Sequence, residues 1–237
     1  MNFPIEIKSR ITTIPNCPEV TIIINSPVTT FVGPNGSGKT QFLRSLRQPL
    51  RNMLQQNGAK GVVKFLSAGR LSHLEQVRSN YDGRRGDNPN YQDLTFGAKS
   101  ISRYRHNSET AYGDFHTLSE RPDIQIKIGE RLRRIFHRDV HIDWDGGNLK
   151  VFFLNTENST KEYPSSMEAS GLLHLVSILA ALYDDEVAAL LIDEPEVSLH
   201  PQLQAFVLQE IHRIAGDPNK SGKKLVFIAT HSPAMIH

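Results

Sequence analysis

The feature that most constrains this chain is a glycine-rich loop near its N-terminus. Residues 33–40 read GPNGSGKT and fit the pattern G-x-x-x-x-G-K-[S/T]. An apolar run at 29–32 precedes the loop, and a helical pattern begins after it, near Gln41. Glycine lets backbone amides close around a phosphate, and the start of a helix adds a positive dipole. The alternative is a glycine-rich turn that matches the pattern by chance, but such a turn would not be expected between a strand and a helix. The sequence therefore predicts a phosphate-binding loop.

The residue types in this loop also indicate what they bind. A lysine at position 39 can reach the β- and γ-phosphates of a nucleotide, and the hydroxyl of Thr40 can ligate Mg²⁺. We therefore expect ATP and Mg²⁺ as cofactors, with Lys39 also counted among the catalytic residues. The remaining contacts with the nucleotide are expected from Gly33, Asn35, Gly36, Ser37 and Gly38.

Two carboxylates at the end of a later apolar strand complete the expected catalytic site. The run 190–195, LLIDEP, places Asp193 and Glu194 directly after buried strand residues. Asp193 is expected to hold Mg²⁺, and Glu194 to polarise the attacking water as general base. An acidic turn after a strand would be the plainer interpretation of an isolated pair. The phosphate-binding loop upstream favours the catalytic one.

A third apolar strand, at 225–229, ends just before a histidine. Ligands of parallel α/β sheets sit at the carboxyl ends of the strands, so His231 is a candidate sensor of the γ-phosphate. A lone histidine is often only structural, and that alternative stays open.

The order of the expected elements defines the fold class. Strands are expected at 5–8, 20–24, 29–32, 62–66, 188–192 and 225–229. Helices are expected from Gln41 until Pro49 disturbs or ends the first, at 124–136, from Ser170, and at 201–215. Such alternation predicts an α/β fold with a mixed, largely parallel sheet, flanking helices and an inserted lobe.

The chain is expected to form one ATPase domain over residues 1–237. Within it, residues 67–120 are polar and weakly periodic, and we interpret them as an insertion with some helix and much loop. Residues 121–169 are expected to add a helix and a β-hairpin, with Gly146 and Gly147 at its turn, and to lead into the helix from Ser170.

Composition excludes some classes of protein. A single cysteine, Cys17, excludes an internal disulfide and favours a reducing compartment. The first residues lack the apolar core of a signal peptide, and the longest apolar run, 172–183, is too short and interrupted to span a membrane. We therefore expect a cytoplasmic protein without a membrane partner.

Taken together, these segments resemble the ABC-type P-loop ATPases over residues 20–66 and 164–237. In that family a serine-glycine signature from one subunit caps the γ-phosphate held by the other, so the resemblance implies a homodimer that closes through its ATP sites. The corresponding residues here are Ser170 and Gly171, with Ser170 also suited to cap the following helix. The second glycine and the glutamine of the usual signature are missing. Arg70 follows the strand at 62–66, where related families carry glutamine, and is an expected nucleotide contact.

The run after the acidic pair distinguishes branches of this family. Residues 194–201, EPEVSLHP, and 229–233, ATHSP, resemble the OLD-like and RecF-like "AAA-type" ATPases of prokaryotes rather than transporter motors. This branch implies DNA maintenance or anti-phage defence with an effector protein, a nuclease or a toxin. The chain stops six residues after His231, so we expect either a truncation or separate effector subunits.

Two alternatives from other classes remain. A nucleotide-gated scaffold with little turnover would agree with the incomplete signature. DNA binding would agree with the charge distribution, because basic residues exceed acidic ones by ten in residues 1–138, and acidic residues exceed basic ones by eight in the rest. The arginines expected to contact DNA are Arg84, Arg85, Arg103, Arg105, Arg131, Arg133, Arg134 and Arg138.

Overall fold

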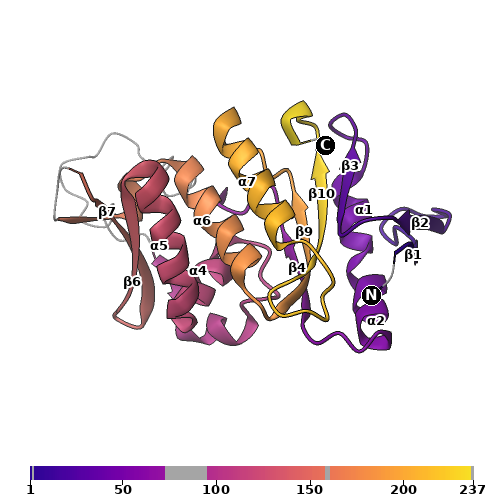
Figure 1. The fold of residues 1–237 in the computed structure, drawn as a ribbon, viewed down its shortest axis with the longest axis horizontal. Helices are drawn as coiled ribbons and strands as arrows, with labels where there is room; N and C mark the ends of the chain where they lie inside the picture. The colour runs from indigo at the N-terminus through magenta and orange to yellow at the C-terminus, as the bar shows by residue number, and fades with distance from the viewer. Residues whose placement is uncertain (2, 73–94, 158–160, 236–237) are drawn as a thin grey trace. The chain divides into compact units, whose positions relative to one another are not determined.

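The computed structural model describes residues 1, 3–72, 95–157 and 161–235. The chain divides into two compact units. The first is formed by Met1–Ala68 with Ala181–His237, and the second by Gly69–Ala180. The fold is of the mixed α/β class with a parallel sheet, as the sequence predicted, and Figure 1 shows the course of the chain.

The first unit is built on a parallel sheet of four strands in the order β3-β10-β9-β4. These strands are β3 (Val28–Val32), β10 (Leu225–Thr230), β9 (Val187–Asp193) and β4 (Val62–Leu66). Every residue of β9 and β10 is buried, which explains their continuous apolar sequences. All four lie within a residue or two of their predicted positions.

One face of this sheet carries the core of the unit. Helices α1 (Lys39–Ser45) and α2 (Arg47–Gln56) bury their apolar residues there against alternate strand residues, together with β1 (Ile5–Ser9) and β2 (Val20–Ile24), which pair antiparallel. The buried residues include Leu43 in α1, Leu50 in α2 and Leu46 between the two helices. Helix α7 (Pro201–Ile214) buries Val207, Leu208 and Ile211. The helix at 201–215 is therefore confirmed.

The helix expected from Gln41 differs from its prediction in one respect. It ends at Ser45, and a second helix, α2, starts at Arg47 with Pro49 in its first turn. Proline is tolerated there because the first amides of a helix have no intrahelical acceptor. Pro49 thus stands at the start of a helix that the sequence reasoning missed.

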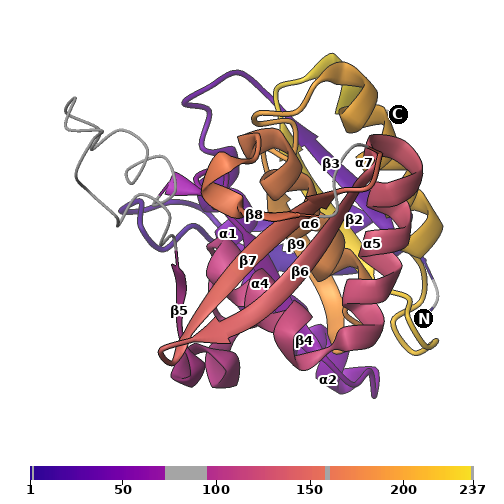
Figure 2. The same cartoon turned by 90° about the vertical axis from the view of Figure 1, so that its left-hand side faces the viewer.

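The second unit combines an antiparallel sheet with helices. Strands β6 (Arg138–Asp145) and β7 (Asn148–Asn155) form the predicted hairpin, with positive φ at Gly146 and Gly147. β5 (Thr95–Ala98) and β8 (Glu162–Pro164) also pair with β7. Figure 2 shows the hairpin with α4 (Ala111–Glu120) and α5 (Pro122–Phe136) beside it.

The predicted polar insertion, 67–120, overlaps this second unit. Its residues 73–94 lie outside the described part of the chain. The described part contains β5, a 3₁₀ helix (Lys99–Tyr104) and α4, whose residues 113–118 are all buried. Helix α4 was hard to predict because it buries polar residues such as Asp114 and His116 together with Phe115, which hides its apolar periodicity.

Helix α6 (Ser170–Tyr183) starts where predicted, and the boundary between the two units falls inside it. Among the described residues, we find no helix with the length and hydropathy needed to cross a lipid bilayer.

Candidate active site

The glycine-rich loop connects β3 to α1, as its sequence predicted. The Lys39 ammonium group donates hydrogen bonds to the carbonyl oxygens of Gly33 (2.7 Å) and Pro34 (2.9 Å), so it spans the inside of the loop. Gly36 and Gly38 have φ of 80° and 86°, in the left-handed region that favours glycine. A Cβ atom added at either position would meet nothing within 4 Å. The loop is therefore open at these two glycines.

Packing between the flanking elements holds the loop in place. The rings of Phe31 on β3 and Phe42 on α1 meet edge to face, 5.3 Å apart. The Phe42 amide donates to the carbonyl oxygen of Gly38 at 2.9 Å, which closes the first turn of the helix. Leu43 is fully buried behind them. The start of α1 is thus fixed against the end of β3.

The carboxyl ends of three neighbouring strands meet beside this loop. In the sheet register, Asp193 on β9 lies opposite Ala229 on β10, and Thr230 lies opposite Val32 on β3. The Thr40 hydroxyl donates a 2.8 Å hydrogen bond to Asp193 Oδ2, joining residues 153 positions apart in the chain. This bond brings the glycine-rich loop and the acidic strand end into one site.

Glu194 has an uncommon backbone conformation for a residue other than glycine. Its φ is 45°, and its amide donates to the Ala229 carbonyl oxygen at 2.8 Å. Non-glycine residues in this region are strained, and they gather at functional sites where the surrounding structure holds them. Here the hydrogen bond to β10 holds the turn that presents the carboxylate.

The structure places His231 next to Glu194. Nδ1 of the imidazole lies 3.5 Å from Glu194 Oε1, and the two side chains are 44% and 25% exposed. Each residue directly follows a buried strand, and both side chains stay partly exposed to solvent. An imidazole and a carboxylate so placed can bind a phosphate oxygen and accept a proton from water.

The residues at this site fit Mg²⁺ and a nucleotide. A hydroxyl oxygen and a carboxylate oxygen are the hard ligands that Mg²⁺ prefers, and Thr40 and Asp193 supply them 2.8 Å apart. The open positions at Gly36 and Gly38 leave space at the loop for a phosphate, and Lys39 supplies a positive charge there.

One carboxylate in this region escaped the sequence reasoning as a site residue. Glu196 is buried, and its Oε1 accepts hydrogen bonds from the Thr230 hydroxyl (2.5 Å) and the amides of His231 (3.1 Å) and Ser232 (3.3 Å). The available signal was a third acidic residue, three positions after Asp193. Its partners lie more than thirty residues away in the chain, so only the fold reveals them.

Ser170 and Gly171 lie in the second unit, where both are half-buried. Ser170 is the first residue of α6 rather than its N-cap as predicted. The carbonyl oxygen of Ala169 accepts from the amides of Leu172 (3.1 Å) and Leu173 (3.4 Å), so Ala169 occupies the cap position. The expected contact of Ser170 and Gly171 with a nucleotide stays a prediction.

Arg70, the other expected nucleotide contact, is fully buried in the second unit. Its Nη1 lies 3.3 Å from His174 Nδ1 on α6, and its carbonyl oxygen accepts from the Ala111 amide at 2.9 Å. Burial, followed by the neighbouring Arg70 charge, lowers the pKa of His174 to about 3. This position gives Arg70 interior contacts, and its expected role at the nucleotide stays a prediction.

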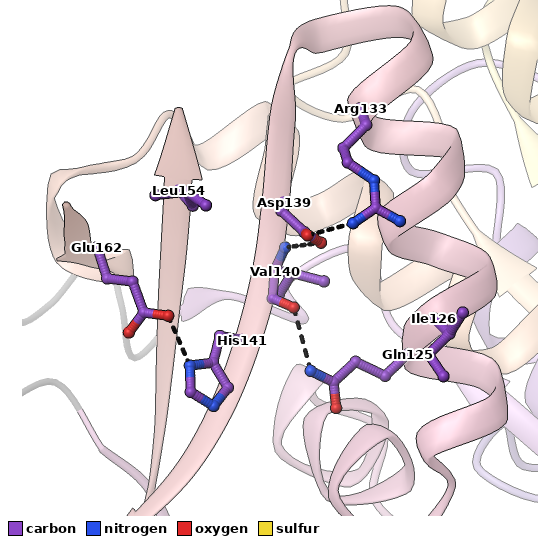
Figure 3. Close-up of a pocket in the computed structure, with 8 residues that line it drawn as sticks. All are labelled: Gln125, Ile126, Arg133, Asp139, Val140, His141, Leu154 and Glu162. Carbon is purple, nitrogen blue, oxygen red and sulfur yellow. Dashed lines mark hydrogen bonds and ion pairs between the residues drawn. The ribbon is translucent and has the colours of Figure 1, made fainter. Parts of the chain in front are cut away.

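The arginine cluster expected to contact DNA belongs in part to a cavity of about 250 Å³ between α5 and the β-sheet (Figure 3). In this cavity Arg133 pairs with Asp139 at 2.6 Å. Arg138, which does not line the cavity, lies 3.5 Å from Glu168. Arg84 and Arg85 lie outside the described residues. The cavity is lined by Gln125, Ile126, Arg133, Asp139, Val140, His141, Leu154 and Glu162. DNA contact by the cluster stays a prediction.

Comparison with known proteins gives one family. The family described as "AAA domain, putative AbiEii toxin, Type IV TA system" matches residues 67–236, more than two thirds of the chain. The chain belongs to this AAA domain family. The match includes Asp193, Glu194 and His231 and begins after the glycine-rich loop. With that loop and the α/β fold, the AAA domain is a P-loop ATPase domain.

Solved structures similar to the AAA domain include two Smc heads. One, bound to the C-terminal winged-helix domain of ScpA, is 11% identical with a TM-score of 0.39, over 58% of this chain and 47% of that one. The other has an extended coiled coil and is bound to the C-terminal domain of ScpA derived from Pyrococcus furiosus. It is 10% identical with a TM-score of 0.38, over 88% of this chain and 56% of that one. The AAA domain thus spans about half of each. No curated protein matches it in sequence.

Proposed function

We propose that this AAA domain binds ATP with Mg²⁺ and hydrolyses it to ADP and phosphate at the site formed by the glycine-rich loop and the ends of β9 and β10. The observation that carries the proposal is the 2.8 Å hydrogen bond from Thr40 to Asp193, which joins a phosphate-binding loop to an acidic strand end. The strand ends beside it present Glu194 and His231 3.5 Å apart. A site for phosphate binding alone would not need these last two groups.

Each residue has a role that follows from its position. Lys39 and the loop amides, from Gly33 to Gly38, would bind the phosphates. Thr40 and Asp193 would hold Mg²⁺, which when bound supplies positive charge to the phosphate oxygens. Glu194 would orient a water molecule and take its proton, while His231 would contact the γ-phosphate.

Substitution of two residues tests this proposal. Lys39→Ala should abolish nucleotide binding or turnover, because it removes the positive charge inside the loop. Glu194→Gln should keep ATP binding and lose about 10²- to 10⁴-fold in turnover, the range for a general base. Steady-state phosphate release and equilibrium binding of ATP measure both effects. Glu130→Gln, at an exposed position of α5, is the matched control and should behave as wild type.

A Glu194→Gln variant that hydrolyses ATP at the parental rate would show that the catalytic assignment is wrong. Wild-type protein that binds ATP without releasing phosphate, with and without DNA, would instead support the nucleotide-gated scaffold.

We further propose that ATP closes a homodimer in which Ser170 and Gly171 of one copy complete the site of the other, and that this motion controls an effector protein, a nuclease or a toxin. The family description, with its putative AbiEii toxin and Type IV TA system, supports a toxin as such an effector. The proposed role in anti-phage defence rests on the OLD-like resemblance of the sequence alone. The EPE-x-x-LHP run at 194–201 supports the OLD-like branch of this family. Direct DNA contact through the arginine cluster is the alternative.

A further inference from the structure

A third carboxylate lies at the proposed catalytic site without a role in the reaction as described so far. The Glu196 side chain is 6% exposed, although the chain around it forms a surface turn after β9. A buried carboxylate is costly unless hydrogen bonds compensate its charge. Glu196 Oε1 accepts three of them, from the Thr230 hydroxyl and from the amides of His231 and Ser232.

These three donors belong to the end of β10. The Thr230 hydroxyl also accepts a hydrogen bond from the Ser232 amide at 2.9 Å, so the turn after the strand is closed on both sides of His231. The Ser232 hydroxyl lies 3.0 Å from Gln204 Oε1, and Gln204 donates to the Leu199 carbonyl oxygen at 2.8 Å. Glu196 therefore connects the turn after β9 to the backbone that carries His231.

The same oxygen also lies beside the imidazole ring. Glu196 Oε1 is 3.4 Å from His231 Nδ1, and Glu194 Oε1 is 3.5 Å from the same nitrogen. An ionised carboxylate can only accept hydrogen bonds. Two of them beside Nδ1 favour the forms of the ring in which that nitrogen carries a proton. With a second proton on Nε2, the imidazolium can also donate to a phosphate oxygen.

We propose that Glu196 is a positioning residue, which holds the imidazole of His231 beside Glu194 and keeps its proton on Nδ1. Its effect on hydrolysis rests on the proposed function, whereas its effect on the ring does not. Partners that orient a metal-binding histidine through its second nitrogen change metal affinity or activity by about 10- to 100-fold when they are removed, and we expect an effect of the same order at His231. Loss of Glu196 should act on turnover through His231 alone.

Two substitutions separate this role from a general effect on folding. Glu196→Ala removes the acceptor of all three hydrogen bonds and the neighbour of Nδ1. Glu196→Gln keeps a carbonyl oxygen in that place. Oε2 has no hydrogen-bond partner among the residues that the structure describes, so an amide group there breaks none of the bonds found.

Nuclear magnetic resonance tests the inference without ATP. Long-range ¹H–¹⁵N spectra of the histidine rings distinguish Nδ1–H from Nε2–H, and His231→Gln identifies the signals of His231. In spectra of the neutral ring, wild type and Glu196→Gln should show Nδ1–H, and Glu196→Ala should shift toward Nε2–H. An Nε2–H ring in wild type would overturn the inference even if Glu196→Ala does not fold, and so would an unchanged ring in Glu196→Ala.

Kinetics then test the connection to hydrolysis. Glu196→Ala should lower kcat about 10- to 100-fold with little change in KM, and Glu196→Gln should restore most of that loss. In a His231→Ala background, adding Glu196→Ala should change kcat by less than about threefold, because coupled residues are not additive. An equal loss in both backgrounds would overturn the inference. Wild type without ATP turnover would refute the proposed function alone, and the ring spectra would still decide the role of Glu196.

Discussion

Replacing Thr40 by valine should weaken the binding of Mg-ATP while leaving the loop folded. Valine has nearly the shape of threonine and lacks the hydroxyl that donates the 2.8 Å hydrogen bond to Asp193 Oδ2. In the Mg²⁺-bound site the hydroxyl would contact the cation instead of donating to Asp193, and Asp193 is 2% exposed, so water would replace the lost oxygen ligand poorly. A polar contact with a charged group contributes about 1.5–3 kcal/mol. At 1.36 kcal/mol for each factor of ten, this corresponds to about 10- to 150-fold in an equilibrium constant.

Calorimetric titration with ATP, in magnesium and in excess EDTA, measures the effect. In magnesium, Thr40→Val should bind ATP about 10- to 150-fold more weakly than wild type. In EDTA the two proteins should bind almost equally, because the hydroxyl then has no metal to hold. Thr40→Ser, which keeps the hydroxyl, should restore the affinity in magnesium. Equal affinities of wild type and Thr40→Val in magnesium, or an equal loss in EDTA, would refute the assignment of Thr40 to the metal.

Two further predictions concern the second unit and the proposed dimer. The pKa of His174 is about 3 in the folded protein and about 6.5 in an unfolded chain. Because the unfolded state therefore gains the proton first as the pH falls, the free energy of unfolding should decrease from about pH 6.5 toward pH 3. The decrease should reach up to ~1.4 kcal/mol per pH unit. Denaturant unfolding of His174→Gln should lack this slope, and an unchanged slope would refute it. Light scattering should show the Glu194→Gln variant as a dimer with ATP. Adding Ser170→Arg should return it to a monomer, because Ser170 is proposed to contact the other copy. A Glu194→Gln variant that stays monomeric with ATP would contradict the proposed dimer.

The sequence reasoning placed the strands and the loop of the candidate site well, because their patterns are local. The glycine-rich loop follows a β-rich run, and the two carboxylates follow an apolar strand. Each of these patterns lies within a few neighbouring residues, so it can be recognised without knowledge of the fold. The fully buried strand β9 needs no alternation of polar and apolar residues, so its apolar run was enough to locate it. Thr40 and Asp193 were each expected to hold Mg²⁺, and the structure places Thr40 Oγ1 and Asp193 Oδ2 2.8 Å apart.

Features that depend on distant contacts were missed or misplaced. Glu196 was not predicted as part of the site, because its hydrogen bonds reach Thr230 and His231 on another strand. Helix α4 was described as part of a loop-rich insertion, because it buries polar groups that find partners only in the folded unit. Its His116, for example, contacts the Ser102 hydroxyl and the Phe96 carbonyl oxygen, both at 2.9 Å. A pattern of hydropathy carries no information about such partners.

The most direct test of the central claim is a single-turnover measurement with radiolabelled ATP and an excess of protein. With magnesium, wild type should convert the bound ATP to ADP, and Glu194→Gln should retain the bound nucleotide as ATP for about 10²- to 10⁴-fold longer. Conversion by Glu194→Gln at the wild-type rate, or no conversion by wild type, would contradict the proposal that this site hydrolyses ATP.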